Sequence, residues 1–218
     1  MELTLGGFAN AVSKKSRSLK WEQFLHLVLP QARETILDIG VNTTEFSPAD
    51  NYLEKHYAYP EKISAVGVSA DFSEFKLRYP AVQLFASDGR KLEFDDDAFD
   101  IVYSNAVIEH VGPRLDQQRF IKEMFRVGRR GYLTTPNRFF PIEVHTRIPL
   151  LHMILPRSAF HRLLRLVGKD WATGDYMHLL SERDLRGLLA DAGIRDFVLI
   201  RNRFLGLPMT FTVTWRKH

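Results

Sequence analysis

Carboxylates stand at the ends of two apolar runs in this 218-residue chain. Asp38 lies in the run Leu37-Asp38-Ile39-Gly40, and Asp88-Gly89 closes a similar run further on. An acidic group at the end of a buried strand is unfavourable unless something positive pairs with it. A glycine beside it lets the backbone approach that partner closely. The two runs therefore predict a site for a ligand that carries positive charge.

Two histidines could take a proton from a reacting hydroxyl group, because the histidine side chain changes its charge near neutral pH and its neutral form accepts a proton. His110 follows an apolar run beside Glu109, which we expect to be structural, and His145 lies further on. The alternative for His110 is a structural role near a helix, and for His145 a solvated position in a lid. His178 and Tyr176 are further candidates. No histidine shows a metal-ligand spacing such as H-E-x-x-H, so we assign no metal.

The elements that must position these residues alternate between strand-like and helix-like runs. This alternation predicts an α/β fold: a Rossmann-like open sheet, mostly parallel, with a C-terminal antiparallel hairpin and helices on both faces. Strands are expected at 35–40, 63–68, 82–86, 100–104, 131–135, 197–204 and 209–216. Helices are expected at 19–29, 72–79, 115–127 and 181–192, the last with Ser181 as N-cap and Gly193 at its end.

The length fits a single domain over residues 1–218. Residues 138–180 match neither the helical nor the strand period, and we interpret them as a lid-like insertion over the edge of the sheet. The leucines of this insertion are interleaved with arginines. Two interpretations stay open. The leucines could pack short helices together, or they could form a lid over an apolar or lipid-linked acceptor or a patch that rests on an anionic membrane.

Composition limits the class of partner. The formal net charge is only +4, and the cluster Lys14, Lys15, Arg17 and Lys20 is expected to be solvated, so no nucleic-acid partner is predicted. The absence of cysteine excludes disulfides and thiolate chemistry. The most apolar stretch, 148–156, is too short to span a bilayer and no secretory signal is visible, so the expected location is the cytoplasm.

The loop after Asp38 distinguishes between cofactor classes. It reads Gly40-Val41-Asn42-Thr43-Thr44, with one glycine, and matches neither the G-x-G-x-x-G pattern of dinucleotide sites nor a Walker loop. S-adenosylmethionine (SAM) has no phosphate and carries a sulfonium and an ammonium group. SAM therefore suits an acidic strand end better than a dinucleotide does.

Further segments repeat a family pattern: Asp88-Gly89 after the third strand, Leu92-Glu93-Phe94 with Phe99-Asp100 before the fourth, and Glu109-His110 after it. With these motifs, residues 35–137 resemble the class I SAM-dependent methyltransferases, in the subgroup that methylates small molecules. The resemblance implies methyl transfer from SAM to a hydroxyl or amine of a small-molecule acceptor. A sugar or a lipid-linked intermediate is a candidate acceptor.

The resemblance also implies roles for individual residues. Asp38 and Gly40 would line the methionine half of the cofactor. Asp88 would accept a hydrogen bond from the adenine amino group, with the Gly89 amide beside it. Asn105 would offer its backbone carbonyl to the SAM ammonium. Each role pairs a donor of the ligand with an acceptor of the protein.

The ribose contact is less direct, because Ser69 stands where the family pattern has an acid. Asp71, two residues on, could supply the carboxylate, or could instead cap the helix expected at 72–79. A non-catalytic binding protein on the same fold is the alternative function that these departures motivate. The sequence does not determine the acceptor or the oligomeric state.

Overall fold

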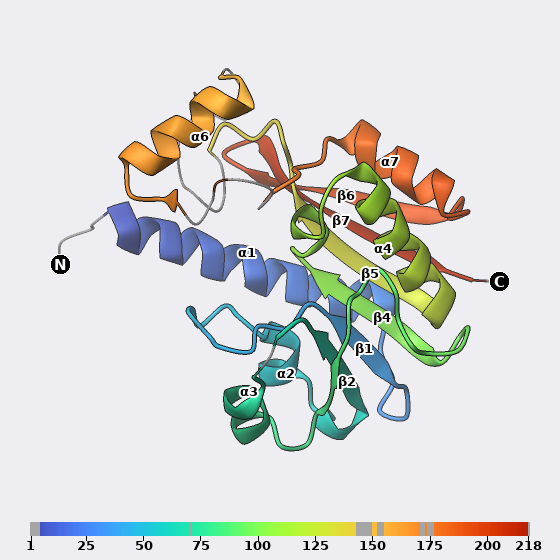
Figure 1. The fold of residues 1–218 in the computed structure, drawn as a ribbon. Helices are drawn as coiled ribbons and strands as arrows, with labels where there is room; N and C mark the ends of the chain where they lie inside the picture. Colours follow the sequence, from blue (N-terminus) through green and yellow to red (C-terminus); the bar gives the residue numbers. More distant parts are fainter. Residues whose placement is uncertain are drawn as a thin grey trace.

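The computed structural model describes residues 5–69, 71–142, 150–151, 155–170, 173 and 177–217, with the backbone alone of 5–13 and 157. Its centre is one seven-stranded sheet in the order β3-β2-β1-β4-β5-β7-β6 (Figure 1). The strands are β1 (Ile36–Ile39), β2 (Ile63–Gly67), β3 (Gln83–Ala86), β4 (Phe99–Asn105), β5 (Gly128–Pro136), β6 (Phe197–Phe204) and β7 (Leu207–Arg216).

The first five strands are parallel, and β7 lies antiparallel between β5 and β6. The predicted fold class and its C-terminal hairpin are therefore confirmed. The order of the strands reverses where β1 pairs with β4, with Asp38 opposite Tyr103. In open sheets of this kind, ligands bind beyond the carboxyl ends of the strands at such a reversal.

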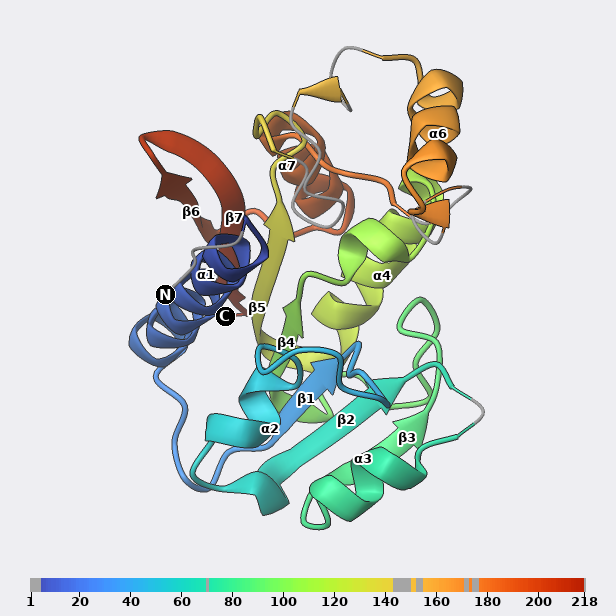
Figure 2. The ribbon, with the colours of Figure 1, turned by 90° about the vertical axis from the view of Figure 1, so that its left-hand side faces the viewer.

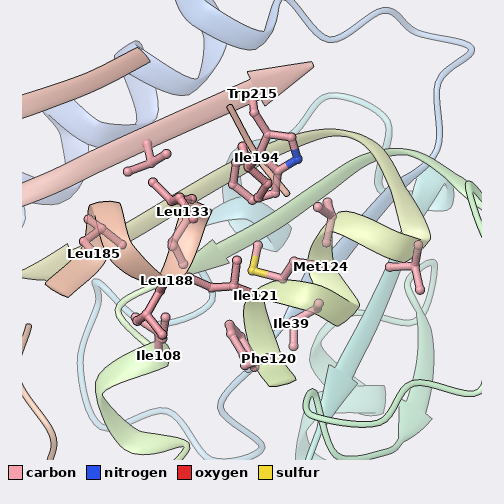
Figure 3. Packing of buried hydrophobic residues seen from close by; sticks show 14 of the residues in the cluster. Ile39, Ile108, Phe120, Ile121, Met124, Leu133, Leu185, Leu188, Ile194 and Trp215 are labelled. Carbon is pink, nitrogen blue, oxygen red and sulfur yellow. The ribbon is translucent and has the colours of Figure 1, made fainter. Parts of the chain in front are cut away.

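One face of the sheet packs against α4 (Arg114–Val127) and α7 (Glu182–Asp191). The apolar stripe of α4 presents Phe120, Ile121 and Met124 to this core, and Leu188 of α7 joins them (Figure 3). Burial of such a stripe is the main source of helix stability in a folded domain. The capping box predicted at the start of α7 is present, since Ser181 and Asp184 bond each other's backbone amides.

The opposite face carries α1 (Leu5–Val28), α2 (Tyr52–His56) and α3 (Ser73–Arg78) (Figure 2). Phe24 of α1 lies edge-on to Tyr103 and Tyr132, which stack on each other with ring centroids 5.3 Å apart. The helix expected at 19–29 is thus longer at its N-terminal side, and it ends where Leu29 turns to a φ of 52° before Pro30. The five-residue α2 is too short to give a periodic signal and was not predicted.

A close approach between neighbouring strands explains one glycine. Gly131 of β5 faces Trp215 of β7 in the antiparallel register, and a Cβ at Gly131 would overlap the indole ring. The bare backbone of Gly131 therefore lets the indole lie across β5 and seal this end of the core, where Trp215 is buried.

The segment expected to form an insertion contains α6 (Arg157–Leu166), which has a small apolar cluster of its own around Phe160 and Leu164. Leu180, at the end of the segment, rejoins the sheet through a bridge to Asn137. Among the described helices, none is long and apolar enough to cross a membrane.

Candidate functional site

Two adjoining cavities lie beyond the carboxyl ends of the central strands. The larger has a volume of about 500 Å³ and is lined by the ends of β1 and β2 and by the loops after β3 and β4. The smaller, about 80 Å³, lies between β1, β4, α1 and the start of α2. The two share Gly40, Val41 and Val107, so they form one continuous groove around the end of β1.

Gly40 separates the two halves of this groove. Its φ is +102°, a region that side chains other than glycine rarely adopt, and a Cβ there would lie 2.7 Å from Val107 Cγ1. The Gly40 amide donates to the Val66 carbonyl at 2.8 Å, which draws the loop toward β2. Glycine is therefore required here both for backbone conformation and for space.

The rest of that loop holds its shape without further glycines. The Asn42 amide donates to Asn51 Oδ1 at 2.9 Å, and Asn51 Nδ2 donates back to the Asn42 carbonyl at 2.8 Å. Asn51 itself adopts a left-handed conformation with φ 47°, which asparagine tolerates better than most residues. This pair of hydrogen bonds fixes the path of the loop, which therefore needs no further glycine.

Asp88 and Gly89, the residues expected to contact adenine, line the larger cavity. Gly89 forms a close-packed floor, because a Cβ there would lie 2.7 Å from both Ile39 and Phe120. The Asp88 carboxylate is held by Arg90, whose Nη2 lies 2.6 Å from Oδ2 and whose Nε lies 3.0 Å from Oδ1. These hydrogen bonds lower the pKa of Asp88, so the carboxylate is anionic at neutral pH.

Arg90 is a residue of this site that the sequence analysis missed. It lines the larger cavity, donates to the Val111 carbonyl at 3.0 Å and lies 3.3 Å from an Asp116 carboxylate oxygen. It thereby connects the loop after β3 to the loop after β4 and to α4. The sequence gives no sign of these contacts, because their partners Val111 and Asp116 are more than twenty residues away.

Asp38 lies at the end of β1 and lines the smaller cavity. It is buried, with 6% of its surface exposed, and so is Glu54 of α2, with 5%. The two carboxyl groups interact electrostatically, and neither oxygen of Glu54 has a hydrogen-bond partner among the described residues. Burial, followed by the negative charge of Glu54, raises the pKa of Asp38 well above its usual value, and burial raises the pKa of Glu54 to about 7.

The basic cluster at the start of the chain is not uniformly solvated, so that prediction is wrong in part. Lys14 and Lys15 are exposed, but Arg17 lines the smaller cavity and Lys20 is buried. Burial, and then the nearby positive charge of Arg17, lowers the pKa of Lys20 to about 7. The spacing of Arg17, Lys20 and Phe24 could have predicted this, because residues three or four apart lie on the same face of a helix and Phe24 faces the core.

Asn105 ends β4 and also lines the smaller cavity. Its Oδ1 accepts a hydrogen bond from Thr134 Oγ1 at 2.5 Å, so the side chain is anchored to β5. The next residue, Ala106, has a φ of 61°, and this left-handed turn carries the chain away from the sheet toward Val107. The end of β4 is therefore fixed from its neighbour strand.

Ser69 and Asp71, the two candidates for the ribose contact, are both engaged in local hydrogen bonds. Asp71 Oδ1 accepts hydrogen bonds from the Ser73 amide at 2.8 Å and the Ser73 hydroxyl at 2.6 Å, at the start of α3. These bonds lower the pKa of the exposed Asp71. Ser69 donates to the Asp71 carbonyl at 2.8 Å. Asp71 thus bonds the first residue of α3, although Phe72 and not Asp71 holds the N-cap position. Neither Ser69 nor Asp71 is among the described residues that line the two cavities.

His110 lines the larger cavity from a short 3-10 turn, Ile108–His110. Glu109 points the other way and is fully buried, where it accepts a hydrogen bond from Thr135 at 3.1 Å, in line with its expected structural role. The His178 amide donates to the Glu109 carbonyl at 2.7 Å, which ties the end of the 138–180 segment to this turn. His145 and Tyr176 lie outside the described residues.

Comparison with known proteins agrees with this geometry. Residues 37–134, from β1 to β5, match the family model described as a methyltransferase domain. Over these residues the chain carries a SAM-dependent methyltransferase domain. It is accordingly a methyltransferase enzyme, and SAM is its cofactor. No curated protein sequence matches the methyltransferase.

Solved structures share the fold of this methyltransferase. A SAM-dependent methyltransferase of Methanosarcina mazei is 20% identical, with a TM-score of 0.53 over 86% of this chain and 94% of that one. The magnesium protoporphyrin IX methyltransferase of Synechocystis, solved with bound SAH (the demethylated product of SAM), is 15% identical, with a TM-score of 0.56 over 98% and 87%. A possible histamine N-methyltransferase of Thermotoga maritima is 16% identical, with a TM-score of 0.58 over 95% and 92%.

The residues of the groove fit the cofactor. SAM has a zwitterionic amino-acid end and an adenosine end, and the groove has a small half and a large half. The small half is lined by the guanidinium of Arg17, which can pair with the carboxylate of a zwitterion, and by the carboxyl group of Asp38, which can pair with its ammonium once it has lost its proton. The large half combines apolar side chains with the anionic Asp88.

Proposed function

We propose that the methyltransferase methylates a hydroxyl or amine group of a small molecule, and that its two cavities bind the two ends of SAM. The observation that carries the proposal is that a guanidinium, of Arg17, and a carboxyl group, of Asp38, line the same smaller cavity. Asp38 binds the ammonium of SAM, and Arg17 binds its carboxylate. The Asn105 backbone carbonyl supplies a second acceptor to the ammonium. When bound, SAM supplies an electrophilic methyl group on a sulfonium.

The adenosine end occupies the larger cavity. Asp88 accepts a hydrogen bond from the adenine amino group, and the Gly89 amide lies beside it. Arg90 keeps the Asp88 carboxylate ionised and oriented, and shares it with the ligand. The ribose contact of Ser69 or Asp71 stays a prediction, because the Asp71 carboxylate must first leave Ser73.

The acceptor is proposed to enter beside His110, under the segment 138–180. Positioning of the two reactants can supply most of the acceleration of a displacement reaction. A hydroxyl acceptor also has to lose a proton, and His110 is the proposed base, with His145 as the second candidate. An amine acceptor needs only to be neutral. That the domain spans 1–218 with 138–180 as its lid, and works in the cytoplasm, remains part of this proposal.

The first test is calorimetry of the wild-type protein with SAH, followed by a screen of acceptors with methyl-labelled SAM. We expect SAH to bind and label to appear on small hydroxylated or amino compounds. Transfer of label only to protein or nucleic acid would overturn the small-molecule assignment. Absence of SAH binding would overturn the proposed use of the groove.

A further inference from the structure

The end of β5 and the turn of the β6–β7 hairpin lie near each other in the fold (Figure 1). Both segments carry large exposed apolar side chains. We define the tip patch as Arg138, Phe139, Ile142, Arg203, Leu205 and Leu207. Its two segments are held together, since Asn137 Nδ2 donates to the Pro208 carbonyl at 2.8 Å and the rings of Phe140 and Phe204 lie 6.4 Å apart. The two segments of the tip patch are therefore held in a fixed arrangement at this edge of the sheet.

The strongest feature of the patch is Leu205, which has 86% of its surface exposed. Leu205 and Gly206 form the two-residue loop of the hairpin, with φ values of 48° and 82°. Two left-handed residues define a type I′ turn, in which asparagine followed by glycine is preferred. A leucine there is strained and gains no packing energy, so hairpin stability does not account for it.

Exposure and charge together indicate the kind of partner. Phe139 is 59% exposed and Leu207 49%, and the patch they belong to also holds two exposed arginines, Arg138 and Arg203. Arg138 lies over the Phe139 ring at 6.0 Å, and Arg203 donates to the Gly206 carbonyl at 2.6 Å. The described residues 137–142 and 203–209 contain no Asp or Glu. Protruding apolar side chains ringed by arginine suit a lipid surface that carries negative headgroups.

We infer that the tip patch docks the protein on anionic lipid bilayers, with Leu205 entering the boundary between headgroups and acyl chains. The β6–β7 turn and the end of β5 lie at the sheet edge that also carries the end of β4, where Pro136 of β5 pairs with Thr210 of β7. Docking would therefore present the cofactor groove's edge to the lipid. The inference does not depend on methyl transfer.

The test is sedimentation of the full chain with phosphatidylcholine vesicles, with and without phosphatidylglycerol. We expect binding only to the anionic vesicles, weakened by salt. Leu205→Asn should reduce the partition coefficient about tenfold or more, because one buried leucine is lost from the lipid. The same change places the preferred residue in the turn, so the melting temperature should hold or rise.

Leu77→Ser is the matched control, since Leu77 is 85% exposed on α3 at the other side of the sheet. This variant should bind vesicles as the wild type does. No binding to anionic vesicles, or equal binding by the wild type and Leu205→Asn, would overturn the inference. A dimer that forms without lipid and is lost in Leu205→Asn would overturn it too, and would assign the patch to a second copy of the chain.

Discussion

The buried carboxyl group of Glu54 interacts electrostatically with that of Asp38, although the two residues belong to different elements, α2 and β1. Both are buried, and burial raises both pKa values, so the pair retains a proton at neutral pH. If Asp38 binds the cofactor's ammonium, as we propose, it must be anionic to do so. The cofactor should then bind best when the pair has lost that proton.

The first prediction concerns the pH dependence of binding. Since the pKa of Glu54 is about 7, SAH affinity should rise as the pH increases through that range. In Glu54→Gln the amide can donate to Asp38, so the carboxylate stays ionised and the rise should flatten. Calorimetry at several pH values measures both. A wild-type affinity that is constant from pH 6 to about 8 would contradict the retained proton.

The same pair predicts an opposite trend in stability. In the folded state Glu54 keeps a proton that the unfolded chain releases above about pH 4.5, so the free energy of unfolding falls as the pH rises from there to about 7. Glu54→Gln removes this loss and should be more stable than the wild type at pH 8 by about 1–3 kcal/mol. Urea unfolding at low and high pH tests it, and a variant less stable than wild type at both would refute it.

The adenine contact predicts a difference between two acidic residues. Asp88→Ala should weaken SAH binding by more than about 1 kcal/mol, roughly a factor of five, because a charge-assisted hydrogen bond is lost. Asp96→Ala is the matched control, since Asp96 lies in an exposed turn with Arg126 as its partner. Calorimetry compares the two, and equal losses would mean that the adenine pocket has been misplaced.

Arg17 predicts selectivity between two ligands. Arg17→Met keeps the apolar stem but removes the charge, and should weaken SAH binding about tenfold or more, as expected for a hydrogen bond between charged groups. Methylthioadenosine lacks the amino-acid end and should bind as before. Lys14→Met, on the exposed side of α1, should change neither affinity. If both ligands lost affinity equally in Arg17→Met, the arginine would be structural.

The acceptor side predicts an effect of His110→Ala on turnover alone. If His110 accepts the proton of a hydroxyl acceptor, turnover should fall by about 10²–10⁴-fold while SAH affinity stays nearly constant. The wild-type pH profile should rise through the histidine range, and this limb should be missing in the variant. Near-normal turnover in His110→Ala would leave positioning as the mechanism, or move the base to His145.

The sequence by itself determined the fold class, the strand ends and the placing of Asp38, Gly40, Asp88 and Asn105 at one edge of the sheet. It could do so because parallel strands joined by helices must all bring their carboxyl ends to the same edge. Local signals were also sufficient for the capping box of Ser181, since its partner Asp184 is only three residues away.

Only the tertiary structure decided which groups meet across that edge. Glu54 reaches Asp38, and Arg17 reaches the same cavity, because α2 and α1 pack on one face of the sheet, and no local pattern encodes that packing. The hydrogen bonds of Asp71 to Ser73 and the burial of Lys20 likewise depend on which partners the fold brings close to them. Charges and hydrogen bonds act over a few ångströms whatever the sequence separation, so their pairing depends on how the helices dock.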